Sequence, residues 1–204
     1  MWIKICGLTT AAAVATALDA EVDALGFVFA ASARHLSVAQ AARLAQPARG
    51  RVRCIAVHRH PTQAALDEIV SGFAPDVLQT DLADLAGLAL PATLELLPVL
   101  RAGTAPPPRL PARLLFEGPV SGSGVATDWQ AARALARRTE LVLAGGLSPD
   151  NVAAAIEAVA PAGVDVSSGV EASPGVKSPA AILAFVNAAR RVAGSPSAVS
   201  KEPV

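Results

Sequence analysis

The sequence predicts an α/β fold, a single (β/α)8 TIM barrel, and three observations support this prediction. Short apolar runs alternate with Ala-rich helical stretches along most of the 204 residues. The apolar runs are continuous rather than alternating with polar residues, which is typical of parallel strands buried on both faces. Ser or Thr precedes several of the helical stretches, as expected of residues that cap helix N-termini. Strand and helix alternating for this long favours a parallel sheet that closes on itself.

Eight strands and at least five helices can be placed on the sequence. The expected strands cover residues 2–6, 24–29, 52–58, 77–80, 94–100, 114–117, 141–145 and 164–168. The expected helices cover 11–18 after Thr10, 38–45 after Ser37, a segment whose first turn holds Pro61, 150–159 after Ser148-Pro149, and 180–192 after Ser178-Pro179. Ser followed by Pro is the usual order of cap and first helical turn.

One connection departs from this pattern. Residues 102–113 contain Pro106, Pro107, Pro108 and Pro111, and proline in a helix interior removes a hydrogen bond and clashes with the preceding turn. We therefore expect the fifth helix to be lost or replaced by a Pro-rich loop. The expected organisation is one barrel domain over residues 1–193 and a flexible C-terminal tail over 194–204, which is rich in Ser and Pro.

Composition narrows the function classes. The 17 basic and 17 acidic residues give a formal net charge of zero, which argues against nucleic acid or an anionic membrane as the partner. No apolar stretch reaches the roughly 18 residues that span a bilayer, and the N-terminus lacks the pattern of a signal peptide, so we expect a cytoplasmic protein. Cys6 and Cys54 are then more plausible as free thiols than as a disulfide. His58 and His60 lack a nearby third ligand, so no metal site is predicted.

The chemistry of this fold lies at the carboxyl ends of the strands. The seventh strand ends in Gly145-Gly146 before a helix, and the eighth in Ser167-Ser168-Gly169. Glycine lets backbone N–H groups approach an anion, and a helix start adds a favourable dipole. The alternative is that the two glycines only make a tight turn. With both segments side by side, a phosphate site is the better interpretation.

Five segments resemble, in order, the signatures of the phosphoribosylanthranilate isomerase family. They are KICGLTT from Lys4, ALGFVF with SARHLS from Ala24, SGSGVATDW from Ser121, LAGGLSPDNV from Leu143 and DVSSGVEASPGVK from Asp165. The resemblance implies a (β/α) barrel of tryptophan biosynthesis that needs no cofactor and binds a small phosphoribosyl substrate. It implies an isomerase that converts N-(5'-phosphoribosyl)anthranilate into 1-(2-carboxyphenylamino)-1-deoxy-D-ribulose 5-phosphate by an Amadori rearrangement. We expect a monomer or a homodimer.

That reaction needs one acid to protonate the ring oxygen and one base to remove the C2' proton. By resemblance, Cys6 is the base and Asp128 the acid. A free thiol has a pKa of about 8.5, so Cys6 needs help to become a thiolate, and Lys4 on the same strand face is a candidate to provide it. A free aspartic acid has a pKa of about 3.9, so Asp128 needs partial burial, for example against Trp129, to act as an acid. If Asp128 instead starts a helix, the helix dipole opposes that role.

The resemblance also implies that Arg34 and Gln79 bind substrate, with Arg34 placed to pair with the anthranilate carboxylate. Two segments depart from the family's pattern. Gln79-Thr80-Asp81 replaces a Gln-Leu-His stretch, and strand six ends in Glu117 where Asp is common. Two alternatives stay open: another phosphosugar barrel isomerase of the histidine-pathway ProFAR type, and a non-catalytic barrel that binds phosphoribosyl ligands.

Overall fold

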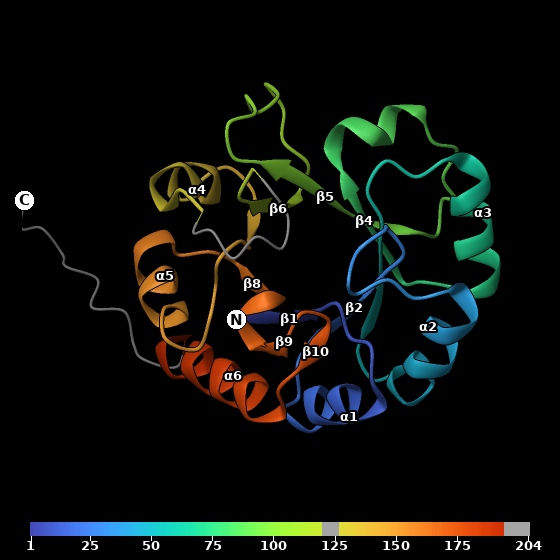
Figure 1. Ribbon diagram of the computed structural model, residues 1–204. Helices are drawn as coiled ribbons and strands as arrows, with labels where there is room; N and C mark the ends of the chain where they lie inside the picture. The colour runs from blue at the N-terminus through green and yellow to red at the C-terminus, as the bar shows by residue number, and fades with distance from the viewer. Residues whose placement is uncertain (120–126, 194–204) are drawn as a thin grey trace, which may run out of the picture.

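The computed structural model describes residues 1–119 and 127–193. Within them, eight parallel strands form a closed barrel in which each strand pairs with the next and the last pairs with the first. Figure 1 shows the strands at the centre and the helices around them. The predicted (β/α)8 barrel is therefore confirmed. The strands are β1 (Trp2–Cys6), β2 (Ala24–Val28), β3 (Arg53–Val57), β4 (Val77–Asp81), β5 (Glu95–Arg101), β6 (Arg113–Glu117), β7 (Glu140–Leu143) and β8 (Gly163–Val166).

Two predicted segments fall largely or wholly outside the described residues. These are the loop of residues 121–128, of which only 127 and 128 are described, and the expected tail, 194–204. Among the described residues, no helix is long and apolar enough to cross a membrane.

Helices begin mostly where capping residues predicted them. They are α1 (Ala11–Asp19), α2 (Val38–Ala45), α3 (Gln63–Gly72), α4 (Trp129–Ala136), α5 (Val152–Val159) and α6 (Pro179–Ala193). Thr10 caps α1, and Ser37 forms a reciprocal capping box with Gln40. Two predicted starts are wrong. Thr62 rather than Pro61 opens α3, and α5 begins after Asn151, because the Asn151 side chain accepts from Ser148 N–H and holds the preceding residues in a turn.

The connections on either side of β5 lack an α-helix. Residues 102–112 form a helix-free loop, as the four prolines predicted. Between β4 and β5 the chain makes only a short 3-10 helix, η2 (Leu82–Gly87), which the sequence analysis did not foresee.

The apolar core has two parts. The larger part lies between the strands and the surrounding helices, and a smaller one fills the barrel interior with side chains such as Ile55, Val77 and Leu97. Charged pairs also occur in the barrel. Arg113 and Glu140 pair at the amino-terminal end with partly exposed side chains, whereas Lys4 and Asp165 pair deep inside, with side chains 0% and 7% exposed.

We expect Asp165→Asn to lower the free energy of unfolding by about 3–5 kcal/mol, because it leaves the Lys4 ammonium buried without a counter-charge. Glu140→Gln is the matched control, since that carboxylate is 61% exposed and its loss should cost at most about 1 kcal/mol. Urea unfolding of both variants measures the difference. Equal losses would contradict the stated role of burial.

Candidate active site

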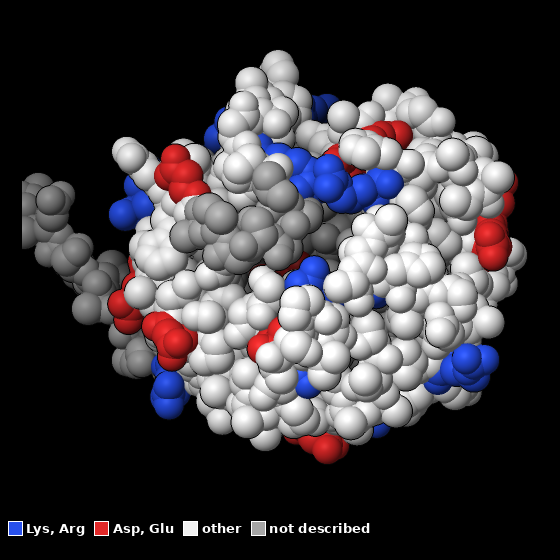
Figure 2. Space-filling model, in the orientation of Figure 1, with Lys and Arg blue, Asp and Glu red and all other residues white. Residues whose placement is uncertain are grey.

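A cavity opens at the carboxyl ends of the strands, where this fold places its chemistry. Figure 2 shows the surface hollowed near the centre of the barrel. Most of the residues proposed from sequence line this cavity. Its lining consists of Cys6, Val28, Ala30, Ala31, Ser32, Arg34, Val57, Arg59, Gln79, Glu117, Ala144, Gly145, Gly146, Leu147, Asp165, Val166, Ser167 and Ser168.

Cys6 and Lys4 point into the barrel together, as the alternation of a strand predicted. Lys4 Nζ donates to Asp165 Oδ1 at 2.9 Å, a bond that joins β1 to its neighbour β8. On the other side, Gly26 of β2 leaves room for both. A Cβ there would lie 3.0 Å from Cys6 Sγ and 3.1 Å from Lys4 Cε. The Cys6 thiol at the cavity and the buried Lys4 ammonium therefore lie side by side.

The surroundings of Cys6 shift the pKa of its thiol in opposite directions. Burial raises the pKa of Cys6 above its usual value, and the Lys4 and Lys177 ammonium groups act to lower it. For Lys4, burial acts to lower the pKa, but Asp165 and Cys6 outweigh burial and raise it, so Lys4 stays charged. Cys54, which is buried outside the cavity, has its pKa raised to about 11 by burial. Of the two thiols, only Cys6 lies beside buried cations.

A second buried charge cluster lies beside the first. Glu171 opens a two-stranded hairpin of β9 (Glu171–Ser173) and β10 (Val176–Lys177). Its carboxylate accepts from Arg34 Nε at 2.7 Å and Nη2 at 2.9 Å, and from Lys177 Nζ at 2.7 Å. These two cations outweigh burial and lower the pKa of Glu171. Lys177 also donates to Ser167 O at 2.9 Å, so the cluster ties Arg34 to the end of β8.

The predicted phosphate segments meet at the cavity wall. Gly145 and Gly146 have φ values of +87° and +66°, a left-handed turn that favours glycine. Asn151 holds this turn by donating to Gly146 O at 2.8 Å. Within the described residues, neither the Gly146 N–H nor the Ser168 hydroxyl has a hydrogen-bond partner. These two donors, on neighbouring loops, are suited to an anion.

Unlike Ser167 and Ser168, Gly169 does not face the cavity. It lies in the 3-10 helix η3 (Ser168–Val170) and is not among the residues that line the cavity. A Cβ there would overlap the carbonyl oxygen of Leu147. Its place in the site is therefore to let η3 pack closely on the loop after β7.

Asp128 lies at the start of α4 as its N-cap. Of the two environments expected from the sequence, burial against Trp129 or a helix start, it is the helix start that the structure shows. Asp128 is exposed, and its carboxylate accepts from Gln130 N at 2.9 Å and Ala131 N at 3.1 Å. The preceding residue, Thr127, is buried and donates from Oγ1 to Ala144 O at 2.7 Å. Asp128 is thus held next to the β7 end of the site but does not line the cavity.

The two departures from the family's pattern contact one another through Arg101. Its Nη2 donates to Asp81 at 2.6 Å, and its Nη1 lies 2.8 Å from Glu117. Gln79, on the same wall, is 6% exposed, and its Oε1 has no partner in the described part of the chain. Asp81 and Glu117 therefore form a network with Arg101, and Gln79 keeps a buried acceptor at the cavity.

Several of these groups were not predicted from the sequence. Asp165, Glu171 and Lys177 all fall inside the quoted DVSSGVEASPGVK segment, yet received no role. The alternation of β8 was a usable signal for Asp165, because Asp165 and Ser167 are two residues apart. Glu171 and Lys177 offered no such signal, because their contacts depend on the folded hairpin.

Comparison with known proteins identifies the family. The family model for N-(5'-phosphoribosyl)anthranilate (PRA) isomerase matches residues 3–188. The chain belongs to this family. An N-(5'-phosphoribosyl)anthranilate isomerase of Mesorhizobium japonicum is 40% identical over 92% of this chain and 94% of its own. The chain is accordingly an isomerase of tryptophan biosynthesis, as the sequence signatures implied.

Solved structures of this family are also similar to the chain. TrpF from Jonesia denitrificans is 37% identical, covers 95% of this chain and 98% of its own, and has a TM-score of 0.80. A phosphoribosylanthranilate isomerase solved with reduced 1-(o-carboxyphenylamino)-1-deoxyribulose 5-phosphate is 25% identical, with 94% and 99% coverage and a TM-score of 0.75.

We expect the Cys6 thiol to ionise above its usual pH range, and Lys177→Met to move that ionisation further upward. The variant removes a cation that favours the thiolate but leaves Glu171 paired with Arg34. The alkylation rate of Cys6 against pH, measured with Cys54→Ser in the background, reports this value. A downward shift would show that Lys177 does not act on the thiol as stated.

Proposed function

We propose that the chain isomerises N-(5'-phosphoribosyl)anthranilate with Cys6 as general base and Asp128 as general acid, and without a cofactor. The observation that supports it best is that the Cys6 thiol, which lies beside Lys4, lines the same cavity as the Gly146 and Ser168 donors. A relative was solved with a reduced product analogue that carries a phosphate and a carboxyphenylamino group. The cavity of this chain has groups suited to both ends of such a molecule.

In this mechanism the phosphate binds to Gly145, Gly146, Ser167 and Ser168, and Gly169 supports those loops. Asp128 delivers a proton to the ring oxygen, the bond from that oxygen to C1' breaks, and the amine nitrogen lone pair forms the Schiff base. The Cys6 thiolate then removes the proton from C2', and the electron pair moves toward the nitrogen to give the enolamine. Tautomerisation to the 2'-ketone completes the rearrangement.

Arg34 and Gln79 bind the rest of the substrate in this proposal. The Nε and Nη2 fork of Arg34 is taken by Glu171, which leaves the outer edge of the guanidinium for the anthranilate carboxylate. The proposal further includes a cytoplasmic location, a monomer or homodimer, and no role for nucleic acid. Loss of phosphoribosylanthranilate fluorescence, with the histidine-pathway substrate assayed alongside, tests the activity and the ProFAR-type alternative together.

We expect Cys6→Ala to lower kcat by about 10²–10⁴-fold while a product analogue still binds, because only the proton-accepting group is removed. Single-turnover kinetics and calorimetric binding measure the two effects separately. Cys54→Ala is the control, since Cys54 is buried outside the cavity and should affect stability more than rate. A normal kcat in Cys6→Ala would refute the role of the thiol, whereas absence of turnover in the wild-type chain would favour the non-catalytic alternative.

Asp128 can be tested as an acid separately from its role as a helix cap. Asparagine keeps a capping oxygen but cannot deliver the proton, so we expect Asp128→Asn to lower kcat by about 10²-fold or more at nearly unchanged stability. Asp128→Ala should lose the same activity and also about 1 kcal/mol of stability. If Asp128→Asn retained full activity, Asp128 would be a cap only.

A further inference from the structure

Arg59 follows β3 and lines the cavity, although no family signature in the sequence drew attention to it. The side chain is exposed. Within residues 1–119 and 127–193, its guanidinium makes no hydrogen bond and no ion pair. A guanidinium that offers five donors at a cavity wall is suited to a planar anion such as a carboxylate.

The backbone around Arg59 is held from both sides. Before it, His58 N donates to Gln79 O at 3.0 Å, which extends the pairing of β3 with β4. After it, His60 N donates to Asp84 Oδ2 at 2.9 Å, and His60 Nδ1 lies 2.8 Å from Asp84 Oδ1. Thr80 donates to the same Asp84 at 2.9 Å. These hydrogen bonds hold the Arg59 backbone in place at the mouth of the cavity. Binding a ligand therefore costs less conformational entropy than it would on an unrestrained loop.

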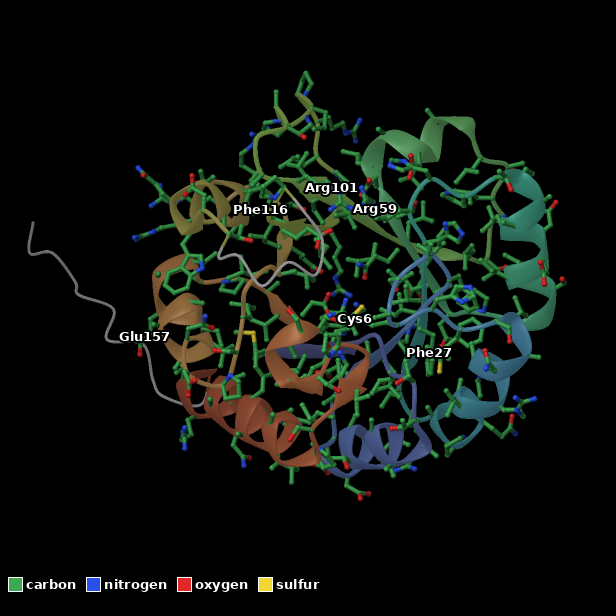
Figure 3. All side chains as sticks on the ribbon, in the orientation of Figure 1. Cys6, Phe27, Arg59, Arg101, Phe116 and Glu157 are labelled. Carbon is green, nitrogen blue, oxygen red and sulfur yellow. The ribbon has the colours of Figure 1, made fainter. Side chains whose placement is uncertain are left out.

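Arg34 and Arg101 nearby already have carboxylate partners. The Arg34 guanidinium donates two hydrogen bonds to the Glu171 carboxylate, and Arg101 contacts both Asp81 and Glu117. Figure 3 places Arg59 and Arg101 on the same side of the barrel mouth, with Cys6 nearer the centre, and Figure 2 shows Lys and Arg gathered on that rim of the hollow. Among the cations on this wall, Arg59 is the one whose charge the described residues leave without a partner.

An apolar surface separates Arg59 from the cavity floor. Val57 also lines the cavity and lies two residues before Arg59, and Val28 of the neighbouring strand lines it as well. An aromatic ring against these valines would direct a substituent toward Arg59 or Arg34, while the phosphate loops lie after β7 and β8. We infer that Arg59 is a second cationic contact for the carboxylate on the substrate's aromatic ring, shared with Arg34, and that it sets specificity for a carboxylated substrate. This inference rests on the proposed substrate.

Binding of two matched ligands tests the inference without turnover. One ligand is reduced 1-(o-carboxyphenylamino)-1-deoxyribulose 5-phosphate, and the other is the same compound without the carboxyl group. We expect Arg59→Met to weaken the first ligand about tenfold, as for the loss of one charged hydrogen bond at a cavity mouth, and to leave the second unchanged. Arg43→Met on α2 is the control, because that arginine is also exposed but does not line the cavity.

Steady-state kinetics give a second readout. If Arg59 contacts the substrate equally in the ground state and the transition state, its loss in Arg59→Met raises KM and leaves kcat nearly constant. Raising the salt concentration should then reduce the difference in KM between wild type and variant. Equal weakening of both ligands, or of neither, would overturn the role of Arg59. Failure of the wild-type chain to bind either ligand would instead overturn the proposed substrate, so the two failures are distinguishable.

Discussion

The buried ion pair between Lys4 and Asp165 is the interaction on which the rest of the site depends. It joins β1 to β8 where the barrel closes, and the two residues are directly paired in register. Two residues further along β1 lies Cys6, and two residues beyond Asp165 lies Ser167, at the start of the segment proposed to bind phosphate. Because a buried charge is tolerated only with its partner in place, this pair holds the Cys6 end of β1 beside that segment.

The charges around Cys6 also bear on its proposed role as a base. Lys4, Lys177 and Arg34 supply three positive charges, and Asp165 and Glu171 supply two negative ones, so the cluster carries one excess positive charge. A Cys6 thiolate would neutralise that excess. Burial nevertheless keeps the pKa of Cys6 above its usual value, so the proposed base depends on the neighbouring cations to favour its thiolate form.

The sequence was sufficient for features that depend on local patterns. Eight strands, the Ser37 cap and the helix-free loop of residues 102–112 follow from apolar runs, cap residues and prolines close together in the chain. The charge cluster was not predictable in this way, because Arg34 and Glu171 are 137 positions apart and meet only after the barrel closes. The start of α5 was misplaced although the contact responsible is local. The Ser148-Pro149 pattern predicted a helix from residue 150, but the Asn151 side chain accepts from Ser148 N–H and the helix begins at Val152.

Asp128 shows how one residue can meet two physical demands. As a cap it accepts hydrogen bonds from two backbone N–H groups in the first turn of α4. As the proposed acid it must carry a proton when the ring opens. Thr127, bonded to Ala144 O, places it next to the loop proposed to hold the phosphate. The start of α4 and the loop after β7 are therefore coupled through two adjacent residues, so the proposed acid and the proposed phosphate loop keep their positions together.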